Sequence, residues 1–119
     1  MKYCMKPDEN KNIKFTPKGL LYVNEWAPLR YAANSAFLCI MASEYTASDS
    51  AFNFAKEQSA YILGEALGKS FVIGFGDKYP KNPHHRASSC PTKPAPCGKG
   101  YLESNRPNPQ TLYVSLQII

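Results

Sequence analysis

Apolar residues recur at helical spacing over the segment from Pro28 to Tyr45. Counted from the first of them, they occupy offsets 0, 3, 4, 7, 8, 11 and 12, which is the pattern of one helical face; they are Leu29, Ala32, Ala33, Ala36, Phe37, Ile40 and Met41. Pro28 suits the first position of a helix, where its missing N–H costs nothing. Leu38 and Cys39 extend the apolar face around the cylinder. We therefore expect a helix that is enclosed on more than one side.

A second helix is expected from about Asp49 to Leu67, after a short break at residues 46–48. Its apolar residues lie on roughly one side; they are Ala51, Phe54, Ala55, Tyr61, Ile62 and Ala66. Thr46, followed three residues later by Asp49, is a weak capping signal. Gly68 follows the run where a left-handed terminating residue is expected, although Gly64 makes the last turn less certain. Two helices joined this closely predict an antiparallel helical hairpin.

The rest of the chain carries no helical period. Residues 1–19 are polar and rich in lysine, and they end in a turn signal at residues 16–19, Thr-Pro-Lys-Gly. Residues 70–76, SFVIGFG, predict a short buried strand or extended segment. Seven of the ten prolines lie in residues 80–109, so we expect a long irregular loop there, of the kind that is usually functional or disordered. Residues 111–119 favour neither helix nor strand.

Length and charge narrow the function classes. A chain of 119 residues allows one small domain or a piece of a larger one. The net charge of +5 comes from basic flanks, but the lysines and arginines stand singly, so we expect a solvated surface and no nucleic-acid partner. The longest apolar stretch, residues 36–42, is far shorter than the roughly 20 residues of a membrane span. Residues 1–12 are too polar for a secretory signal, so we expect no signal peptide in this chain and no membrane partner.

Four cysteines are too few and too irregularly spaced for a disulfide-stapled scaffold. Cys39 lies inside the apolar helical run and is interpreted as a small core residue. Cys90 and Cys97 share the proline-rich segment, where a bridge between them is one option. A zinc site built from these two cysteines and from His84 and His85 is a weaker option, because adjacent histidines rarely converge on one ion and no CxxC pair is present. We expect no metal.

The densest set of chemically active side chains lies in residues 75–91, which include both histidines of the chain. Pro83 restricts the backbone before His84, and Arg86 points the same way as His84 if the segment is extended. An imidazole beside a guanidinium fork can grip adjacent hydroxyls of a sugar, a phosphate or a carboxylate. The alternative is a surface loop whose His and Arg side chains bond backbone carbonyls. No GxSxG elbow and no phosphate-binding loop is present.

Several motifs, in order and with compatible spacing, resemble glycoside hydrolase family 9, the endo-β-1,4-glucanases. The histidine signature of that family is similar to residues 70–76, Lys78, residues 83–86 (Pro-His-His-Arg) and residues 88–91 (Ser-Ser-Cys-Pro). Upstream, residues 16–20, Trp26, residues 29–34 and residues 36–38 look like the inner-helix sequence of the family, and residues 61–64 look like the end of its next helix. The resemblance covers residues 16–91 best and resumes weakly at residues 107–109 and 112–113.

The resemblance implies an all-α fold, in which this chain is a fragment of an (α/α)6 barrel: a helical hairpin, a short extended segment and a long proline-rich active-site loop. It also implies hydrolysis of internal β-1,4 linkages of cellulose with inversion, by an Asp that activates water and a Glu that acts as the acid. The histidine and arginine that bind sugar hydroxyls beside the scissile bond map onto His84 and Arg86. His84 is thus the candidate catalytic residue. The implied partners are cellulose and cellooligosaccharides, without a cofactor, and the full-length parent is expected to be extracellular.

The departures from the family pattern matter equally. The catalytic Asp pair of the family would fall before Met1 and its acid Glu beyond Ile119, and none of the nine acidic residues takes their place. Lys78-Tyr79 stands where the family often has Asn-Pro; Tyr79 is a candidate for stacking on a sugar ring, or else a core or hinge aromatic. Residues 92–119 look divergent or truncated, so residues 1–119 are interpreted as a partial catalytic domain.

We therefore expect a cellulase fragment that does not hydrolyse glucan alone. A non-catalytic carbohydrate-binding remnant, in which His84, Arg86, Trp26 and Tyr79 hold sugar, is the alternative, and a small basic zinc or nucleic-acid module is a less favoured one. A barrel cut to a fraction of its circumference leaves apolar faces such as Leu29, Phe37 and Ile40 without partners. The isolated chain is expected to be marginally stable or to aggregate.

Overall fold

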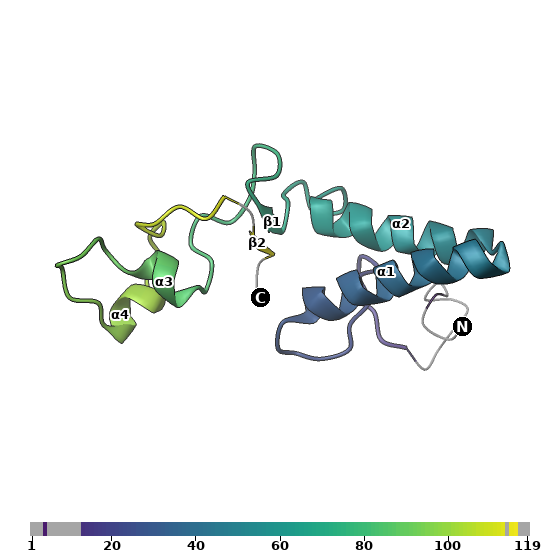
Figure 1. Ribbon diagram of the computed structural model, residues 1–119, viewed down its shortest axis with the longest axis horizontal. Coiled ribbons are helices and arrows are strands. Elements are labelled where there is room, and N and C mark those ends of the chain that lie inside the picture. Colours follow the sequence, from purple (N-terminus) through teal and green to yellow (C-terminus); the bar gives the residue numbers. More distant parts are fainter. Residues whose placement is uncertain (1–3, 5–12, 114, 117–119) are drawn as a thin grey trace.

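The computed structural model describes residue 4, residues 13–113 and residues 115–116. The described chain is mainly helical, with α1 (Pro28–Thr46), α2 (Asp49–Leu63), α3 (Arg86–Ser89) and α4 (Lys99–Leu102). Two short strands, β1 (Val72–Ile73) and β2 (Ser115–Leu116), pair antiparallel. The molecule is elongated, 55 × 25 × 24 Å, with the α1–α2 hairpin at one end, α3 and α4 at the other, and the strands between them (Figure 1). Among the described helices, none combines the length and the apolar character that crossing a membrane needs.

Helix α1 begins at Pro28, as predicted, and ends one residue beyond the predicted boundary. Its two flanking residues, Ala27 and Ala47, both adopt the left-handed conformation, with φ of 52° and 48°. Such a conformation stops the helical hydrogen-bond pattern at each end, at a cost of about 1 kcal/mol or more for a residue with a Cβ. The abrupt change of chain direction at Ala47 leads directly into α2.

Only one side of α1 packs against α2. The buried side carries mostly small residues, namely Leu29, Ala32, Ala36, Cys39 and Ser43. The predicted face was therefore wrong in part, because Phe37 and Met41 are 62% and 43% exposed and lie on the opposite side of the helix. Small side chains let the two helices approach closely, so α2 selects this side over the bulkier one. The described chain leaves the second apolar side of α1 uncovered.

Helix α2 begins at Asp49, as predicted, but its N-cap and its C-terminal end differ from the prediction. The N-cap is Ser48, whose hydroxyl accepts a hydrogen bond from the backbone N–H of Ala51, and not Thr46. The helix ends at Leu63, four residues before the predicted boundary, because Gly64 adopts a φ of 113°. A Cβ at Gly64 would lie 2.7 Å from the carbonyl carbon of Lys69, so this early end requires glycine. The chain then turns back and places Phe71 under the helix end.

The turn at residues 16–19 forms as predicted and packs on α2. Gly19 N–H donates to the carbonyl of Thr16, and Phe15 pairs with Leu21 across the turn. Gln58 of α2 bonds this turn through both atoms of its side-chain amide. Its Oε1 accepts from Leu21 N–H at 2.7 Å, and its Nε2 donates to the Gly19 carbonyl at 2.9 Å. The connecting segment before α1 is thereby held against the core.

The extended segment predicted at residues 70–76 contains a regular strand only at β1. Its partner is β2, so the C-terminal segment, for which the sequence favoured neither helix nor strand, forms a strand at residues 115–116. Gly74 adopts a φ of 83°, and a Cβ there would overlap the carbonyl oxygen of Tyr113. Glycine at this position thus permits the close approach of the two segments. The rest of the undecided segment, residues 114 and 117–119, lies outside the described residues.

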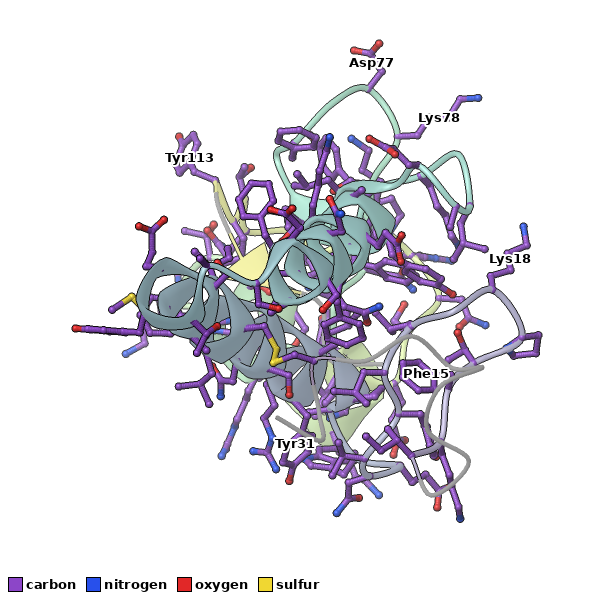
Figure 2. The ribbon with its side chains drawn as sticks, turned by 90° about the vertical axis from the view of Figure 1, so that its right-hand side faces the viewer. Phe15, Lys18, Tyr31, Asp77, Lys78 and Tyr113 are labelled. Atoms are coloured by element: carbon purple, nitrogen blue, oxygen red, sulfur yellow. A yellow bond between two sulfur atoms is a disulfide. The ribbon has the colours of Figure 1, made fainter. Side chains whose placement is uncertain are left out.

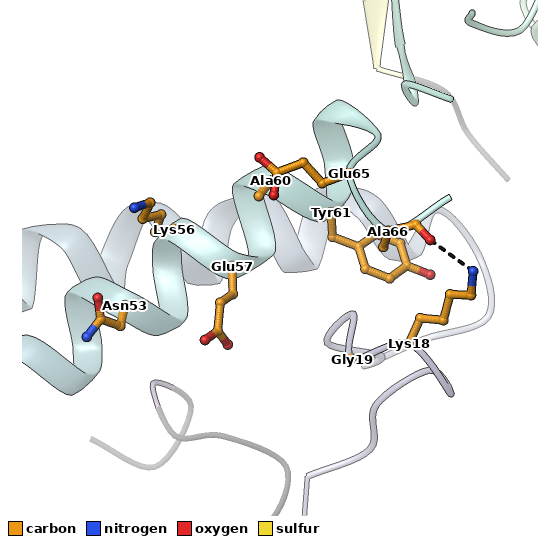
Figure 3. A pocket seen from close by; sticks show the side chains of 9 residues that line it. All are labelled: Lys18, Gly19, Asn53, Lys56, Glu57, Ala60, Tyr61, Glu65 and Ala66. Carbon is orange, nitrogen blue, oxygen red and sulfur yellow. Dashed lines mark hydrogen bonds between the residues drawn. The ribbon is translucent and has the colours of Figure 1, made fainter. Parts of the chain in front are cut away.

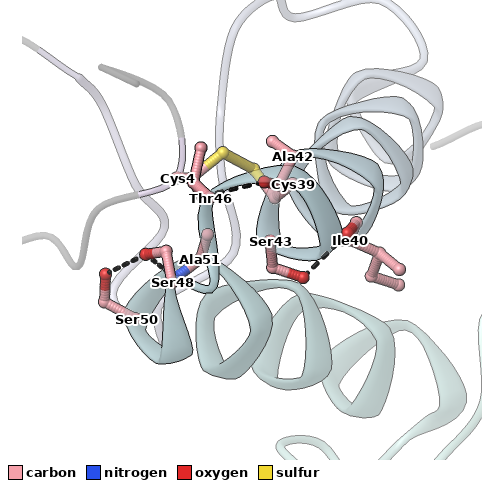
Figure 4. The surroundings of a disulfide bond; sticks show 9 residues. All are labelled: Cys4, Cys39, Ile40, Ala42, Ser43, Thr46, Ser48, Ser50 and Ala51. Carbon is pink, nitrogen blue, oxygen red and sulfur yellow. Dashed lines mark hydrogen bonds between the residues drawn. A yellow bond between two sulfur atoms is a disulfide. The ribbon is translucent and has the colours of Figure 1, made fainter.

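Two disulfides join all four cysteines, Cys4 to Cys39 and Cys90 to Cys97. Cys39 is buried, as predicted, but its interpretation as a simple core residue was wrong, because its sulfur bonds that of Cys4 on the side of α1 (Figure 4). The bridge that was one option for the proline-rich segment is present. The prediction that this segment lacks regular structure was wrong at two places, where the four-residue helices α3 and α4 form.

Candidate functional site

The histidine loop, residues 79–90, contains the short helix α3 near its end. Pro83 is buried, whereas the side chains of His84, His85 and Arg86 are exposed. His85 is the N-cap of α3, since its Nδ1 accepts a hydrogen bond from Ser88 N–H at 3.1 Å. Arg86 is the first residue of that helix, so the condition under which Arg86 would point the same way as His84, a segment extended throughout, is not met. The cap gives the two adjacent histidines different environments.

His84 contacts a residue that is 58 positions away in the sequence. Its ring lies edge-on to the indole of Trp26, with ring centroids 6.3 Å apart and planes at 86°. Trp26 is 61% exposed, and no hydrogen bond to the His84 ring is formed within the described part of the chain. Both side chains therefore present polar and aromatic surface to solvent at one place. As a binding residue, Trp26 was named only within the non-catalytic alternative, and neither periodicity nor spacing could pair it with His84.

Arg86 is exposed and makes no ion pair with any described residue. Its backbone carbonyl accepts a hydrogen bond from the hydroxyl of Ser89 at 2.9 Å, which belongs to the first turn of α3. Within the described ranges its guanidinium also donates no hydrogen bond to a backbone carbonyl, which the surface-loop alternative assumed. Its five donors remain available for an oxygen-rich ligand.

Tyr79 is half-buried, and one face of its ring is occupied. The ammonium of Lys81 lies 3.6 Å from the ring centroid, which is a cation–π contact. Any sugar that stacks on Tyr79 must therefore use the other face or displace Lys81.

Acidic residues do not gather at this loop. Asp77 stands at the tip of the exposed turn between Gly74 and Lys78, projecting away from the helices (Figure 2). Among the described residues, no three His, Cys, Asp or Glu side chains are placed to hold a metal ion. The zinc alternative was wrong in its ligands, because Cys90 and Cys97 are oxidised to a disulfide and offer no thiolate.

A pocket of about 740 Å³ lies at the other end of the molecule, between the turn at residues 18–19 and α2. Lys18 reaches across it and donates to the carbonyl of Ala66 at 2.9 Å (Figure 3). Lys56, Glu57 and Glu65 give its lining a mixed charge. Tyr79, His84 and Arg86 are not in this lining, so the pocket is separate from the histidine loop.

The candidate site is therefore the exposed ring pair of Trp26 and His84, with the exposed guanidinium of Arg86 two residues further along the chain. Aromatic rings bind the apolar faces of sugars, while imidazole and guanidinium donors bond hydroxyls, so this set of groups suits a neutral polyol chain. A phosphate would also suit Arg86, but it would gain nothing from Trp26. The described residues place no carboxylate pair beside this surface.

Solved structures share this arrangement of elements. An endoglucanase from the termite Nasutitermes takasagoensis matches 83% of this chain with a TM-score of 0.71 and 47% sequence identity. The cellulase Cel9M from C. cellulolyticum, in complex with cellobiose, matches 82% of the chain with a TM-score of 0.68 and 30% identity. The chain covers 23% and 22% of those two structures, respectively. The hairpin is thus a fragment of an (α/α)6 barrel.

The sequence comparisons agree with the structural ones. "Endoglucanase 5" of Arabidopsis thaliana is 39% identical over 104 residues, which are 75% of this chain and 17% of that protein. "Endoglucanase A" of Bacillus pumilus is 41% identical over 83 residues, which are 66% of this chain and 13% of that protein. Residues 1–116 match Glycosyl hydrolase family 9. The chain belongs to this family of glycoside hydrolases, and it spans about a fifth or less of the length of these curated relatives.

Proposed function

We propose that this chain is the substrate-binding part of an endo-β-1,4-glucanase, in which His84 and Arg86 bond hydroxyls of a glucose unit beside the scissile linkage. The contact between Trp26 and His84 carries the proposal, because it places an exposed indole beside an exposed imidazole. An indole can cover one face of the sugar ring while the imidazole and guanidinium bond its edge. The complexes of related cellulases with cellobiose and cellotetraose support a β-1,4-glucan as the ligand.

The whole enzyme is proposed to hydrolyse internal β-1,4 bonds of cellulose with inversion. His84 and Arg86 do not themselves activate water or protonate the leaving oxygen; they fix the sugar so that a carboxylate pair, supplied by parts of the barrel outside this chain, can act. A misplacement of about 1 Å can cost on the order of a hundredfold in rate. This chain alone is therefore expected to bind glucan without hydrolysing it.

An extracellular location is proposed for the parent protein. Two disulfides join the four cysteines of the chain. Structural disulfides persist in oxidising compartments and are rare where glutathione keeps thiols reduced. The proposed substrate, an insoluble polysaccharide, is also encountered outside the cell.

Calorimetric titration with cellotetraose tests the proposal. Because a hydrogen bond involving a charged group contributes about 1.5 to 3 kcal/mol, His84→Ala and Arg86→Ala should each weaken binding by at least about tenfold. Arg86→Lys keeps the charge but loses the fork and should restore only part of the affinity. Tyr113→Ala, which removes an exposed aromatic away from the loop, is the matched control and should leave affinity unchanged.

Two results would contradict the proposal. Equal affinity of the His84 and Arg86 variants and the unmodified chain would remove the histidine loop from the binding site. The second is release of reducing ends from carboxymethylcellulose by the purified chain, abolished in His84→Ala. That result would show that this chain hydrolyses glucan without carboxylates from other parts of the barrel.

A further inference from the structure

We propose that Asn108 is a positioning residue that holds the histidine loop by hydrogen bonds and so determines where His84 and Arg86 lie. The inference rests on the function proposed above, since it assigns the support of the same site. Asn108 lies 22 residues after Arg86, in the segment that follows α4. Neither the proline-rich composition of that segment nor its weak resemblance to the family pointed to this role.

The side-chain amide of Asn108 bonds both Pro83 and Ser88, which flank His84 and Arg86 in the sequence. Its Nδ2 donates to the carbonyl oxygen of Pro83 at 2.9 Å and to the hydroxyl of Ser88 at 2.7 Å. Pro83 directly precedes His84, and Ser88 follows Arg86 by two residues. One amide group thus bonds the chain on both sides of the two proposed sugar-binding side chains.

Two backbone hydrogen bonds hold the same loop in addition to those of the Asn108 side chain. Asn108 N–H donates to the carbonyl of Lys81 at 2.9 Å, and Gln110 N–H donates to the carbonyl of Ser88 at 3.0 Å. The segment from Lys81 to Ser88 is therefore held at three points by two residues of the later segment. Pro83 is buried and Ser88 is only 2% exposed, so water does not replace these partners freely.

An amide is needed because the Pro83 carbonyl and the Ser88 hydroxyl both accept a hydrogen bond here, and the NH2 group of Asn108 supplies two donors. The Ser88 hydroxyl already donates to the carbonyl of His85 at 3.1 Å and so has lone pairs left to accept from Asn108. The Pro83 carbonyl accepts from His85 N–H at 2.8 Å and offers its second lone pair to Asn108. An aspartate of the same size would place a carboxylate against the Pro83 carbonyl and lose the donors.

The single tryptophan of the chain provides a site-specific readout that does not depend on sugar binding. An imidazole in contact with an indole can quench its fluorescence. Because His84 contacts Trp26, Trp26 should fluoresce more strongly in His84→Gln than in the unmodified chain at the same pH. This difference is the His84-dependent quenching, and it reports whether His84 lies beside Trp26.

The test compares Asn108→Ala and Asn108→Asp with Asn105→Ala, an exposed asparagine three residues away. If Asn108 positions the loop, both Asn108 variants should lose at least half of the His84-dependent quenching, and Asn105→Ala should keep all of it. Both Asn108 variants should also bind cellotetraose about tenfold more weakly, while the far-UV circular dichroism of the α1–α2 hairpin stays unchanged.

Three outcomes overturn the inference. If both the His84-dependent quenching and the affinity stay at the wild-type level, Asn108 does not position the binding groups. The same conclusion follows if the quenching falls without any change in affinity. Loss of helical signal in both Asn108 variants would make Asn108 a general structural residue. If the unmodified chain binds no cellotetraose, the proposed function fails, while the fluorescence of the variants still decides whether Asn108 holds His84 in place.

Discussion

The uncovered side of α1 predicts how the isolated chain behaves in solution. Phe37 and Leu38 are 62% and 64% exposed, and they lie on the side of α1 opposite to α2. In an (α/α)6 barrel an inner helix has neighbours on more than one side, so this side is built for burial. We predict that the double variant Phe37→Gln, Leu38→Gln associates with itself far less than the unmodified chain does.

The magnitude follows from the exposed fractions. Complete burial of a Phe or Leu side chain contributes about 1.5 to 3 kcal/mol. Since somewhat more than half of each side chain is exposed here, burying the remainder contributes roughly 1 to 2 kcal/mol per residue. The two substitutions together should weaken association roughly 30- to 700-fold. Glutamine is a good helix former, so α1 itself should persist.

Sedimentation velocity over a wide range of concentrations measures the association, and far-UV circular dichroism checks the helix content. Val23→Gln, which replaces an exposed apolar residue outside α1, is the matched control and should associate like the unmodified chain. The reasoning is refuted if the double variant associates as strongly as the control. It is also refuted if the unmodified chain is a monomer at every concentration.

Two further predictions concern the core and are measured in that less associating background. Replacing Cys4 by Ser and Cys39 by Ala opens a link between residues 35 apart in sequence and should lower stability by roughly 3 to 4 kcal/mol, seen as a lower urea midpoint; an unchanged midpoint would contradict this. Gln58→Leu leaves the buried N–H of Leu21 without its acceptor, at a cost of about 1 to 3 kcal/mol, so hydrogen exchange at that amide should accelerate roughly 5- to 150-fold. Gln110→Leu, whose side-chain bond is exposed, is the control, and equal exchange in the two variants would show that Gln58 does not hold the turn.

Local rules predicted the elements whose signals lie within a few residues of one another. The 3.6-residue period and the proline at the first helical position correctly predicted where α1 begins. The Thr-Pro-Lys-Gly signal correctly predicted the turn at residues 16–19. The C-terminal end of α2 was not predictable in the same way, because two glycines competed. Gly64 terminates the helix since the Lys69 backbone packs directly against it, and that contact depends on the fold.

In the candidate site, too, adjacent residues predicted one part and the fold decided the other. A motif of adjacent residues pointed to His84 and Arg86, because its Pro-His-His-Arg order resembles the family signature. Their different environments required the structure: the exposed His85 caps α3 through its Nδ1, while His84 contacts Trp26. Likewise, the amide of Asn108 reaches the loop only because the later segment folds back across it.

The sequence by itself determined the hairpin and the turn, because helix periodicity, proline and glycine act over a few bonds, and its Pro-His-His-Arg motif named the candidate site residues. Tertiary structure alone decided which side of α1 is buried, that Cys39 pairs with Cys4 and which groups surround His84. These choices depend on the distance and packing of segments that lie far apart in the sequence, and no local pattern encodes such distances.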